Sequence, residues 1–278
     1  MSNDVFIQAV EIVDGADIDT AVPEHLLRGL RRADDFIRLA VAAGAAVMAS
    51  LPAEASLPED TGIFIGTTTG SLDTNFHFLD TLIDDGEGQS SPTLFSHSVH
   101  NSAAGYVSRS FEIRGPALTV TTSGWPFLAA LAEANAALMS GQLKAALVIG
   151  AEEDTPLIAE ARDRMAAAGE KGVAPPVCRK GAVGWLLTAD PANGEESFPR
   201  LGMIDLEEQM AEPADYLIRN ETISSSCGND HDDLLGPDML ASAVDLSRAI
   251  AKVKGKKIPL LEWQLEASFG RAQVSVIF

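Results

Sequence analysis

Two short apolar segments ending in glycine constrain the fold more than any other feature of this sequence. They are GIFIG at residues 62–66 and KAALVIG at residues 144–150. Apolar runs of this length, without polar residues at every second position, are typical of strands buried on both faces. Such strands need helices on both sides of their sheet, so the sequence predicts a layered α/β fold with much parallel sheet.

Segments with helical spacing alternate with these strands. We expect one long helix over residues 24–51, whose alanine-rich end would let another helix pack closely. Further helices are expected over residues 98–111 and 128–141, and a β-rich run lies between them at residues 117–122.

The last third of the chain carries weaker signals. A helix is expected over residues 237–253, with Pro237 near its start and Gly255 just beyond its end. The expected strands are 182–188, 201–206, 222–226, 258–263 and 272–278.

The bulk properties indicate a globular protein that avoids polyanions. With 278 residues and 46% apolar content, the chain can bury a full core. Forty acidic residues against twenty basic ones give a net charge of −20, which repels nucleic acid and anionic membrane surfaces. We therefore expect neutral, basic or shape-matched partners, with no binding to nucleic acid or membrane.

The sequence gives no sign of export. Its start lacks a basic segment followed by an apolar one, and no apolar run is long enough to cross a membrane. The two cysteines, Cys178 and Cys227, cannot form a disulfide framework and suit a reducing compartment. A cytoplasmic protein is the expectation.

Four phrases occur in a distinctive order after the first helix. They are GIFIGTTTG (62–70), SPTLFSHSVHNSAAG (91–105), EIRGPALTVTTSGWPFLAAL (112–131) and KAALVIGAEE (144–153). This order resembles the amino-terminal half of β-ketoacyl synthases, condensing enzymes of the thiolase fold. The sequence of residues 95–105 is similar to that of a short subgroup linked to polyene chain-length factors.

The resemblance extends to the end of the chain. GAVGWLLTAD (181–190) is similar to the family's glycine-rich strand, and ASFGRAQVSVIF (267–278) to its closing loop and strand. It implies a thiolase-like α/β/α/β/α fold, with a ketosynthase-like amino-terminal half over residues 1–190. Residues 191–278 would be an abbreviated carboxy-terminal half of the same unit, shortened by internal deletions because the closing motif is present.

The resemblance also shows which chemistry is missing. Condensation in this fold needs a cysteine thiolate to hold the acyl chain and two histidines that assist decarboxylation. The family's cysteine lies between a buried strand and a helix, and Gly124 stands at that place, with Ser123 before it and Trp125 after it. Glycine has no nucleophile, and a serine would need a nearby base.

Neither assisting histidine has a counterpart. The phrase SSCGNDHDD at residues 225–233 is the nearest match to the first histidine motif, and it puts Ser225 in the histidine's place. The second histidine should lie within residues 251–270, which contain none. The joint loss implies a subunit of a β-ketoacyl-[acyl-carrier-protein] synthase complex without activity of its own.

The family resemblance implies a role in chain-length control. Such subunits pair with an active synthase and close the end of its acyl tunnel, in polyketide, aryl polyene or fatty acid biosynthesis. The candidate tunnel or pocket residues are Ser123, Gly124, Trp125, Phe127 and Phe269, although Phe127 is equally suited to core packing. Acyl carrier proteins are acidic, so the synthase partner would dock them and this chain would meet them only indirectly.

Two other functions fit the same sequence. One is a thiolase-fold acyl hydrolase or decarboxylase using Ser123 or Cys227 as nucleophile, although no motif-like histidine or lysine lies near Cys227 to lower its pKa. The other is an acyl-binding scaffold that forms only homodimers. Neither function requires a cofactor.

Three local patterns contain residue types that are common in binding sites. His97 and His100 could form a metal pair with Glu152 and Glu153, but the preferred interpretation is a helix start capped by Ser96 or Ser98, with one histidine in the interior. Residues 229–233 carry ligand atoms without calcium-loop spacing, which favours a polar turn.

The third pattern is TTTGS at residues 67–71, which could suggest a phosphate loop. No Gly-Lys-Thr follows it, so a surface turn over the pocket is expected. We therefore predict no metal site in this chain.

Overall fold

The computed structural model describes residues 4–122, 124–167, 180–189, 198–208, 240–253, 260–267 and 270–278. Its strands are β1 (Val5–Asp14), β2 (Thr61–Thr67), β3 (Ala117–Thr121), β4 (Ala145–Glu152), β5 (Gly181–Thr188), β6 (Arg200–Glu208), β7 (Leu260–Ala267) and β8 (Gly270–Ile277). Its α-helices are α1 (Ile18–Ala21), α2 (Glu24–Leu27), α3 (Asp35–Ser50), α4 (Leu72–Asp85), α5 (Pro92–His97), α6 (Ser102–Phe111), α7 (Pro126–Met139), α8 (Pro156–Ala167) and α9 (Ala241–Val253). Two 3₁₀ turns, η1 (Gly15–Asp17) and η2 (Glu87–Gln89), complete the described elements.

The eight strands form one mixed sheet in the order β3-β2-β4-β5-β1-β6-β8-β7. Strand β2 pairs in parallel with β3 and β4, while the other five strand pairs are antiparallel. The expectation of much parallel sheet is therefore wrong outside β2, β3 and β4. Strand β1 causes much of the difference, because it lies between β5 and β6 and pairs antiparallel with both.

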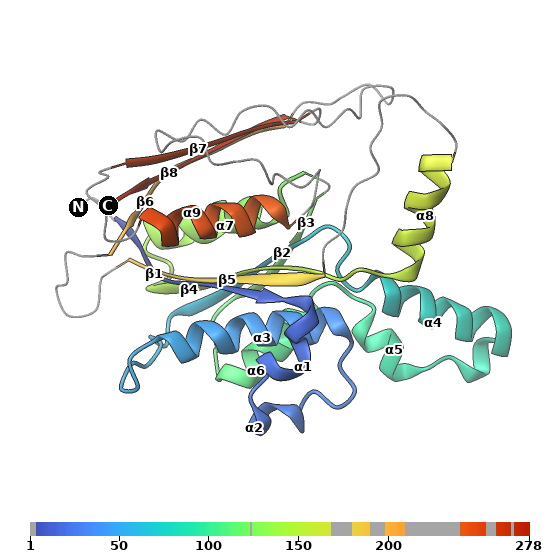
Figure 1. The fold of residues 1–278 in the computed structure, drawn as a ribbon. Helices are drawn as coiled ribbons and strands as arrows, with labels where there is room; N and C mark the ends of the chain where they lie inside the picture. Colours follow the sequence, from blue (N-terminus) through green and yellow to red (C-terminus); the bar gives the residue numbers. More distant parts are fainter. Residues whose placement is uncertain are drawn as a thin grey trace.

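The sheet curls so that its two ends form separate layers (Figure 1). Strands β1 to β5 form one layer, with α3 and α6 on one face and α7 and α9 on the other. Among the described residues, these halves of the sheet are joined where Val5 and Phe6 pair with Leu201 and Arg200. Beyond this point β6, β8 and β7 pass over α7 and α9. The described order of layers is thus helices, sheet, helices, sheet.

The core forms two clusters, one on each side of the β1–β5 layer. In β2, Phe64 faces the cluster that contains α7 and α9, whereas Ile63 and Ile65 face the cluster that contains α3 and α6. Every residue of β2, β4 and β5 is buried. The prediction that residues 62–66 and 144–150 form strands buried on both faces is confirmed.

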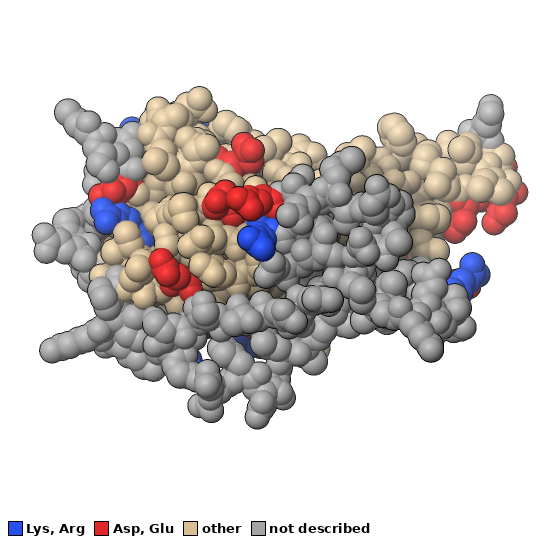
Figure 2. Space-filling view, turned by 90° about the horizontal axis from the view of Figure 1, so that it is seen from above, with Lys and Arg blue, Asp and Glu red and all other residues tan. Residues whose placement is uncertain are grey.

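The layer of β6, β8 and β7 is buried on one face only. Leu261, Trp263 and Val274 point into the core, and polar side chains alternate with them on the outer face. Figure 2 looks onto this side of the molecule and shows acidic side chains gathered near its middle. No helix in the described part of the chain covers this face, where the expected fifth layer would lie.

The expected helix over residues 24–51 is wrong as a single element. It is two helices, α2 and α3, because the Asp34 backbone is extended and its carboxylate caps the start of α3, accepting a hydrogen bond from the Ile37 amide at 2.9 Å. The close packing expected at its alanine-rich end is confirmed. A side chain at Gly44 would lie 2.6 Å from the Phe111 ring of α6.

The remaining expectations have mixed outcomes. Most predicted helices and strands are present within a few residues of their expected bounds, but β1, α1, α4, α5 and α8 have no predicted counterpart. The sequence signal available for β1 is its mostly apolar run at residues 5–13, which alternates between buried and partly exposed residues over its first half. The strand expected at residues 222–226 lies outside the described residues, and the division at residue 190 stays a prediction.

None of the helices among the described residues is both long and apolar enough to span a bilayer.

Strand β2 and the start of α7 approach each other through a glycine. A Cβ placed on Gly66 would lie 2.1 Å from the Pro126 carbonyl oxygen, and the next nearest atoms also belong to the backbone. Backbone atoms of a buried helix start cannot move aside as a flexible side chain can, so this position excludes every side chain.

We predict that Gly66→Ala lowers the free energy of unfolding by about 2–4 kcal/mol, because α7 must move away from the sheet. The matched control is Gly105→Ala, on the exposed side of α6, where an added Cβ meets nothing within 4 Å. That change should raise stability by about 0.5–1 kcal/mol through helix propensity. Equilibrium urea unfolding measures both, and equal stabilities for the two variants would contradict the prediction.

Candidate functional site

The turn between β3 and α7 carries the position that the resemblance assigns to the catalytic cysteine. Gly124 is half-buried there, and its amide donates to the Thr122 hydroxyl at 3.3 Å. Trp125 is the N-cap residue of α7 and makes no capping bond with its side chain. Pro126 follows at the first helical position, where its ring fixes φ and it has no N–H to donate.

The two aromatic residues of this turn have different surroundings. Phe127 is 1% exposed and makes an edge-to-face contact with Trp185, with ring centroids 5.3 Å apart. The Trp185 indole in turn donates to the Ser247 hydroxyl of α9 at 2.8 Å, so Phe127 packs in the core. Trp125 is only half-buried at the edge of the same cluster, and its tunnel role stays a prediction.

Several predicted site residues cannot be placed. Ser123, Ser225 and Phe269 lie outside the described residues, as do both cysteines, Cys178 and Cys227. The polar turn expected at residues 229–233 also lies there.

A buried carboxylate organises the loop that follows β2. Glu152, at the end of β4, is fully buried and accepts hydrogen bonds from the amides of Thr68 and Thr69 and the hydroxyls of Thr67 and Thr69. Burial raises the pKa of Glu152, and these four hydrogen bonds act in the opposite direction. The TTTGS loop therefore does surround a hydrogen-bond acceptor, but the acceptor is the protein's own Glu152 side chain.

The expectation of a surface turn at this loop is wrong, because residues 67 and 69–71 are buried. The loop also reaches the vacant nucleophile position. The Thr68 hydroxyl donates to the Thr122 carbonyl oxygen at 2.9 Å, and Thr122 accepts from the Gly124 amide through its own hydroxyl. A continuous set of hydrogen bonds thus runs from Glu152 to Gly124, and sequence reasoning missed it because its ends are far apart in the chain.

The histidine pair serves structure in different ways. His97 is buried, and its Nε2 lies 3.0 Å from the Tyr106 hydroxyl, which confirms the interpretation of an interior histidine. His100 packs against Gly70, whose φ of +48° and lack of a side chain allow the close approach. The described residues contain no group of three or more side chains suited to a metal ion.

The capping expected from Ser96 or Ser98 is wrong. Helix α5 begins at Pro92, and the Ser91 hydroxyl caps it by accepting from the Leu94 amide at 3.3 Å. The hydroxyls of Ser96 and Ser98 instead donate to carbonyl oxygens one turn earlier in the chain. A proline at the first helical position is the signal that would have placed this start correctly.

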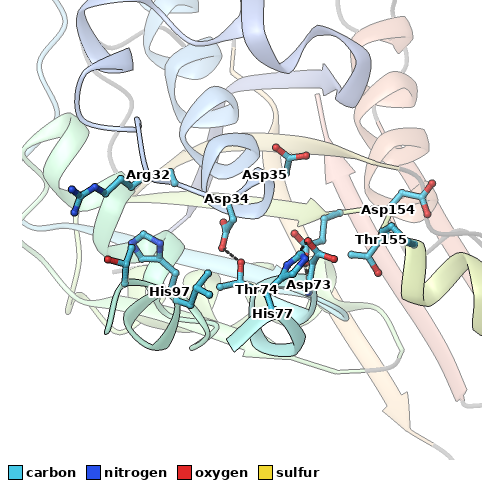
Figure 3. A pocket seen from close by; sticks show the side chains of 14 residues that line it. Arg32, Asp34, Asp35, Asp73, Thr74, His77, His97, Asp154 and Thr155 are labelled. Atoms are coloured by element: carbon cyan, nitrogen blue, oxygen red, sulfur yellow. Dashed lines mark hydrogen bonds and ion pairs between the residues drawn. The ribbon is translucent and has the colours of Figure 1, made fainter. Parts of the chain in front are cut away.

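A second feature, an acidic pocket of about 460 Å³, lies where α3, α4 and α8 begin (Figure 3). Its lining includes five carboxylates and two histidines, namely Asp34, Asp35, Asp73, Glu153, Asp154, His77 and His97. Sequence reasoning missed this pocket. The adjacent acidic pairs at residues 34–35 and 153–154 were the available signal, but nothing in the sequence placed them together.

Two of these carboxylates act as partners for helix starts. Asp34 caps α3, and it also accepts from the Thr74 hydroxyl at 2.6 Å. Glu153 accepts from the Asp73 amide at the start of α4 at 3.1 Å. The first amides of a helix carry partial positive charge, so acidic side chains are favourable at these positions.

The carboxylates nevertheless affect one another's pKa. Burial raises the pKa of Glu153 to about 8, with help from the nearby charges of Asp34, Asp73 and Asp35 and against the hydrogen bond from the Asp73 amide. Burial raises the pKa of Asp34 as well. At neutral pH most molecules therefore carry a protonated Glu153.

Comparison with known proteins gives one family. The model of the amino-terminal domain of β-ketoacyl synthases matches residues 8–187, which is more than half of the chain. Among curated protein sequences, none matches.

Solved structures match over nearly the whole chain. The ishigamide ketosynthase/chain length factor has 16% identity and a TM-score of 0.70, covering 99% of this chain and 99% of that one. A ketosynthase in complex with its chain length factor from Xenorhabdus doucetiae has 15% identity and a TM-score of 0.59, covering 98% and 99%. A β-ketoacyl synthase from Burkholderia phymatum STM815 has 12% identity and a TM-score of 0.72, covering 100% and 99%. At these identities the likeness concerns the fold, and it confirms the expected thiolase-like fold.

The ionisation of Glu153 can be tested through stability. Its pKa is near 4.5 when unfolded and about 8 when folded, so between these values the folded state binds more protons. The free energy of unfolding should then fall as pH rises from about 5 to 8, by at most about 1.4 kcal/mol per pH unit from this group. Glu153→Gln keeps an acceptor for the Asp73 amide and should flatten this slope.

Urea unfolding of both proteins at a series of pH values measures the difference. Other titrating groups cancel when the variant is compared with the unmodified chain at each pH. The variant should gain stability relative to the unmodified chain as pH rises to about 8, with little further change above it. A constant difference across this range would show that Glu153 is ionised throughout.

Proposed function

The chain belongs to the β-ketoacyl synthase family, and we propose that it acts there as a non-catalytic, chain-length-factor-like subunit. It would pair with an active synthase and shape the end of the acyl tunnel in polyketide, aryl polyene or fatty acid synthesis. The observation that carries this proposal is Gly124, a residue without a side chain at the position assigned to the nucleophile.

The residues around Gly124 support a turn that keeps its hydrogen bonds but has no catalytic nucleophile. Glu152, Thr68 and Thr122 still connect the turn to the sheet. A thiolate at a helix start is stabilised by the first amides of that helix, and Pro126 supplies none at its position. The absence of histidine from residues 251–270 points the same way.

The edge of the sheet supports assembly with a second chain. Strand β3 is the last strand at its end of the sheet, paired only with β2 among the described strands. It is not fully buried at any residue, and Leu118 is 43% exposed. An edge strand of this kind is a ready template for pairing with another strand. Two matched structures are named for a ketosynthase together with a chain length factor, which fits a heterodimer.

Trp125 is the better position at which to test tunnel shaping, because the Phe127 side chain is buried in the core. In a complex with an active synthase, Trp125→Ala removes on the order of a hundred Å² or more of aromatic surface and should lengthen the products. Phe127→Ala should instead lower the stability of the chain by about 3–5 kcal/mol. Mass spectrometry of the products and urea unfolding measure the two effects. An unchanged product distribution from a folded, assembled Trp125→Ala complex would remove the gating role.

We further predict that Gly124→Cys does not create a condensing enzyme. A cysteine at this helix start could be acylated slowly by a reactive thioester. Elongation would still lack general acid and base groups, which typically contribute about 10² to 10⁴-fold each.

The assay uses the purified variant without a partner, with acyl and malonyl carrier thioesters, and mass spectrometry detects the β-keto product. Only acyl-enzyme should accumulate. Robust elongation by the variant, or by the unmodified chain alone, would mean that a working active site exists in this sequence.

A further inference from the structure

An arm formed by residues 72–99, containing α4 and α5, extends beyond the sheet (Figure 1). Its two ends lie together, because the hydroxyl of Ser71, directly before the arm, donates to the Ser98 carbonyl oxygen at 2.9 Å. Helix α4 has 14 residues, of which only Thr74 is buried. The buried attachment of α4 to the rest of the protein therefore lies in its first turn.

Two carboxyl groups hold this first turn of α4. Asp34, directly before α3, accepts from the Thr74 hydroxyl with one oxygen at 2.6 Å (Figure 3) and from the Ile37 amide with the other at 2.9 Å. Glu153, directly after β4, accepts from the Asp73 amide at 3.1 Å. The acidic pocket of about 460 Å³ is lined by both carboxyl groups and by the first turn of α4, so the arm meets the rest of the protein across a cavity.

The two carboxyl groups have unequal surroundings. Both oxygens of Asp34 accept hydrogen bonds, an arrangement that suits the ionised form. Glu153 is only 3% exposed, and burial disfavours a charge on it. When two carboxyl groups share a buried site, the charge of the first opposes ionisation of the second. Glu153 therefore holds a proton at neutral pH, in agreement with its pKa of about 8.

The other charged groups of the pocket come from every element around it. They are Arg32, Asp34 and Asp35 before and at the start of α3, Asp73 and His77 on α4, His97 on α5, and Asp154 before α8.

Few cations balance these carboxylates. The described lining includes one arginine, Arg32, which is exposed, and no lysine. Lys180, from outside the lining, lies 2.5 Å from Asp35, and the His77 Nδ1 lies 3.3 Å from Asp73. An ionised Glu153 would therefore add a negative charge to a site where negative charges are already in excess.

We propose that the acidic pocket is a pH-sensitive hinge, in which protonated Glu153 keeps the arm closed and loss of the proton releases the first turn of α4 while the core stays folded. Opening relieves the charge, because water then reaches Glu153 and the carboxyl groups separate. The arm moves as one unit, because the Phe78 ring of α4 packs on the Phe95 ring of α5 with centroids 5.4 Å apart. This hinge lies within one chain and operates whether or not the chain has a partner.

The direction of the pH effect follows from proton binding. The pKa of Glu153 is about 8 in the closed state and near 4.5 once water surrounds the group. Between these values the closed state binds more protons, so its advantage is complete below about pH 5 and is lost as pH rises to about 8. The equilibrium constant for opening should rise by up to about tenfold per pH unit over this range and level off above it.

Hydrogen exchange of the full chain, followed by mass spectrometry at a series of pH values, measures this opening. Protection factors, which are corrected for the intrinsic effect of pH on exchange, are compared between peptides from α4 and from the buried helix α7. Protection of α4 should be lower than that of α7 and should fall with rising pH as described. Low concentrations of urea should reduce the protection of α7 and leave that of α4 unchanged, because local opening exposes little surface.

Three variants, each checked for folding by circular dichroism, assign the effect to its groups. Glu153→Gln keeps an acceptor for the Asp73 amide but cannot ionise, so the protection of α4 should stay within about threefold from pH 5 to 8. The matched control is Asp154→Asn, which removes a carboxyl group from the adjacent, exposed residue and should leave the pH profile of α4 unchanged. Thr74→Val removes the hydroxyl that donates to Asp34 and should lower the protection of α4 by about 2- to 10-fold at every pH.

Two results would overturn the hinge. If α4 and α7 exchange with the same protection and the same urea dependence at every pH, α4 opens only when the whole chain unfolds. If α4 opens locally but Glu153→Gln retains the pH dependence of the unmodified chain, Glu153 is not the group that controls the arm.

Discussion

The buried carboxylate of Glu152 is the interaction on which the candidate site depends. It joins the end of β4 to the loop after β2, and that loop holds the Thr122 carbonyl before Gly124. A buried carboxylate is costly unless it is fully hydrogen-bonded, and four donors from three consecutive threonines meet this need. The three parallel strands β2, β3 and β4 therefore end in one connected structure whose stability does not require a catalytic residue.

This separation explains how the chain can keep its fold with a glycine at position 124, which the resemblance assigns to the nucleophile. Core packing comes from side chains such as Phe127 and Trp185, which lie behind the turn and contact each other, not a substrate. Gly124 takes part in these hydrogen bonds through its backbone amide, which needs no side chain. In the proposed complex, the reacting groups would belong to the partner.

Acidic residues have three different physical roles in this protein. Asp34 and Glu153 accept hydrogen bonds from backbone amides at the starts of α3 and α4. Glu152 organises a loop from within the core. Asp84 and Asp85 are exposed to solvent at the end of α4, next in the chain to the exposed Ile83. A net charge of −20 by itself predicts only the partners to be avoided.

The sequence by itself determined the buried strands and the absence of a reactive side chain at position 124. Local apolar runs at β2 and β4 report burial directly, and glycine at position 124 has no reactive group in any fold. Only the tertiary structure decided the antiparallel place of β1, the contact between Glu152 and Thr68, and the meeting of Asp34 with Thr74. These contacts join residues far apart in the chain, and hydrophobic periodicity describes only neighbours within a few turns, so no local pattern could have specified them.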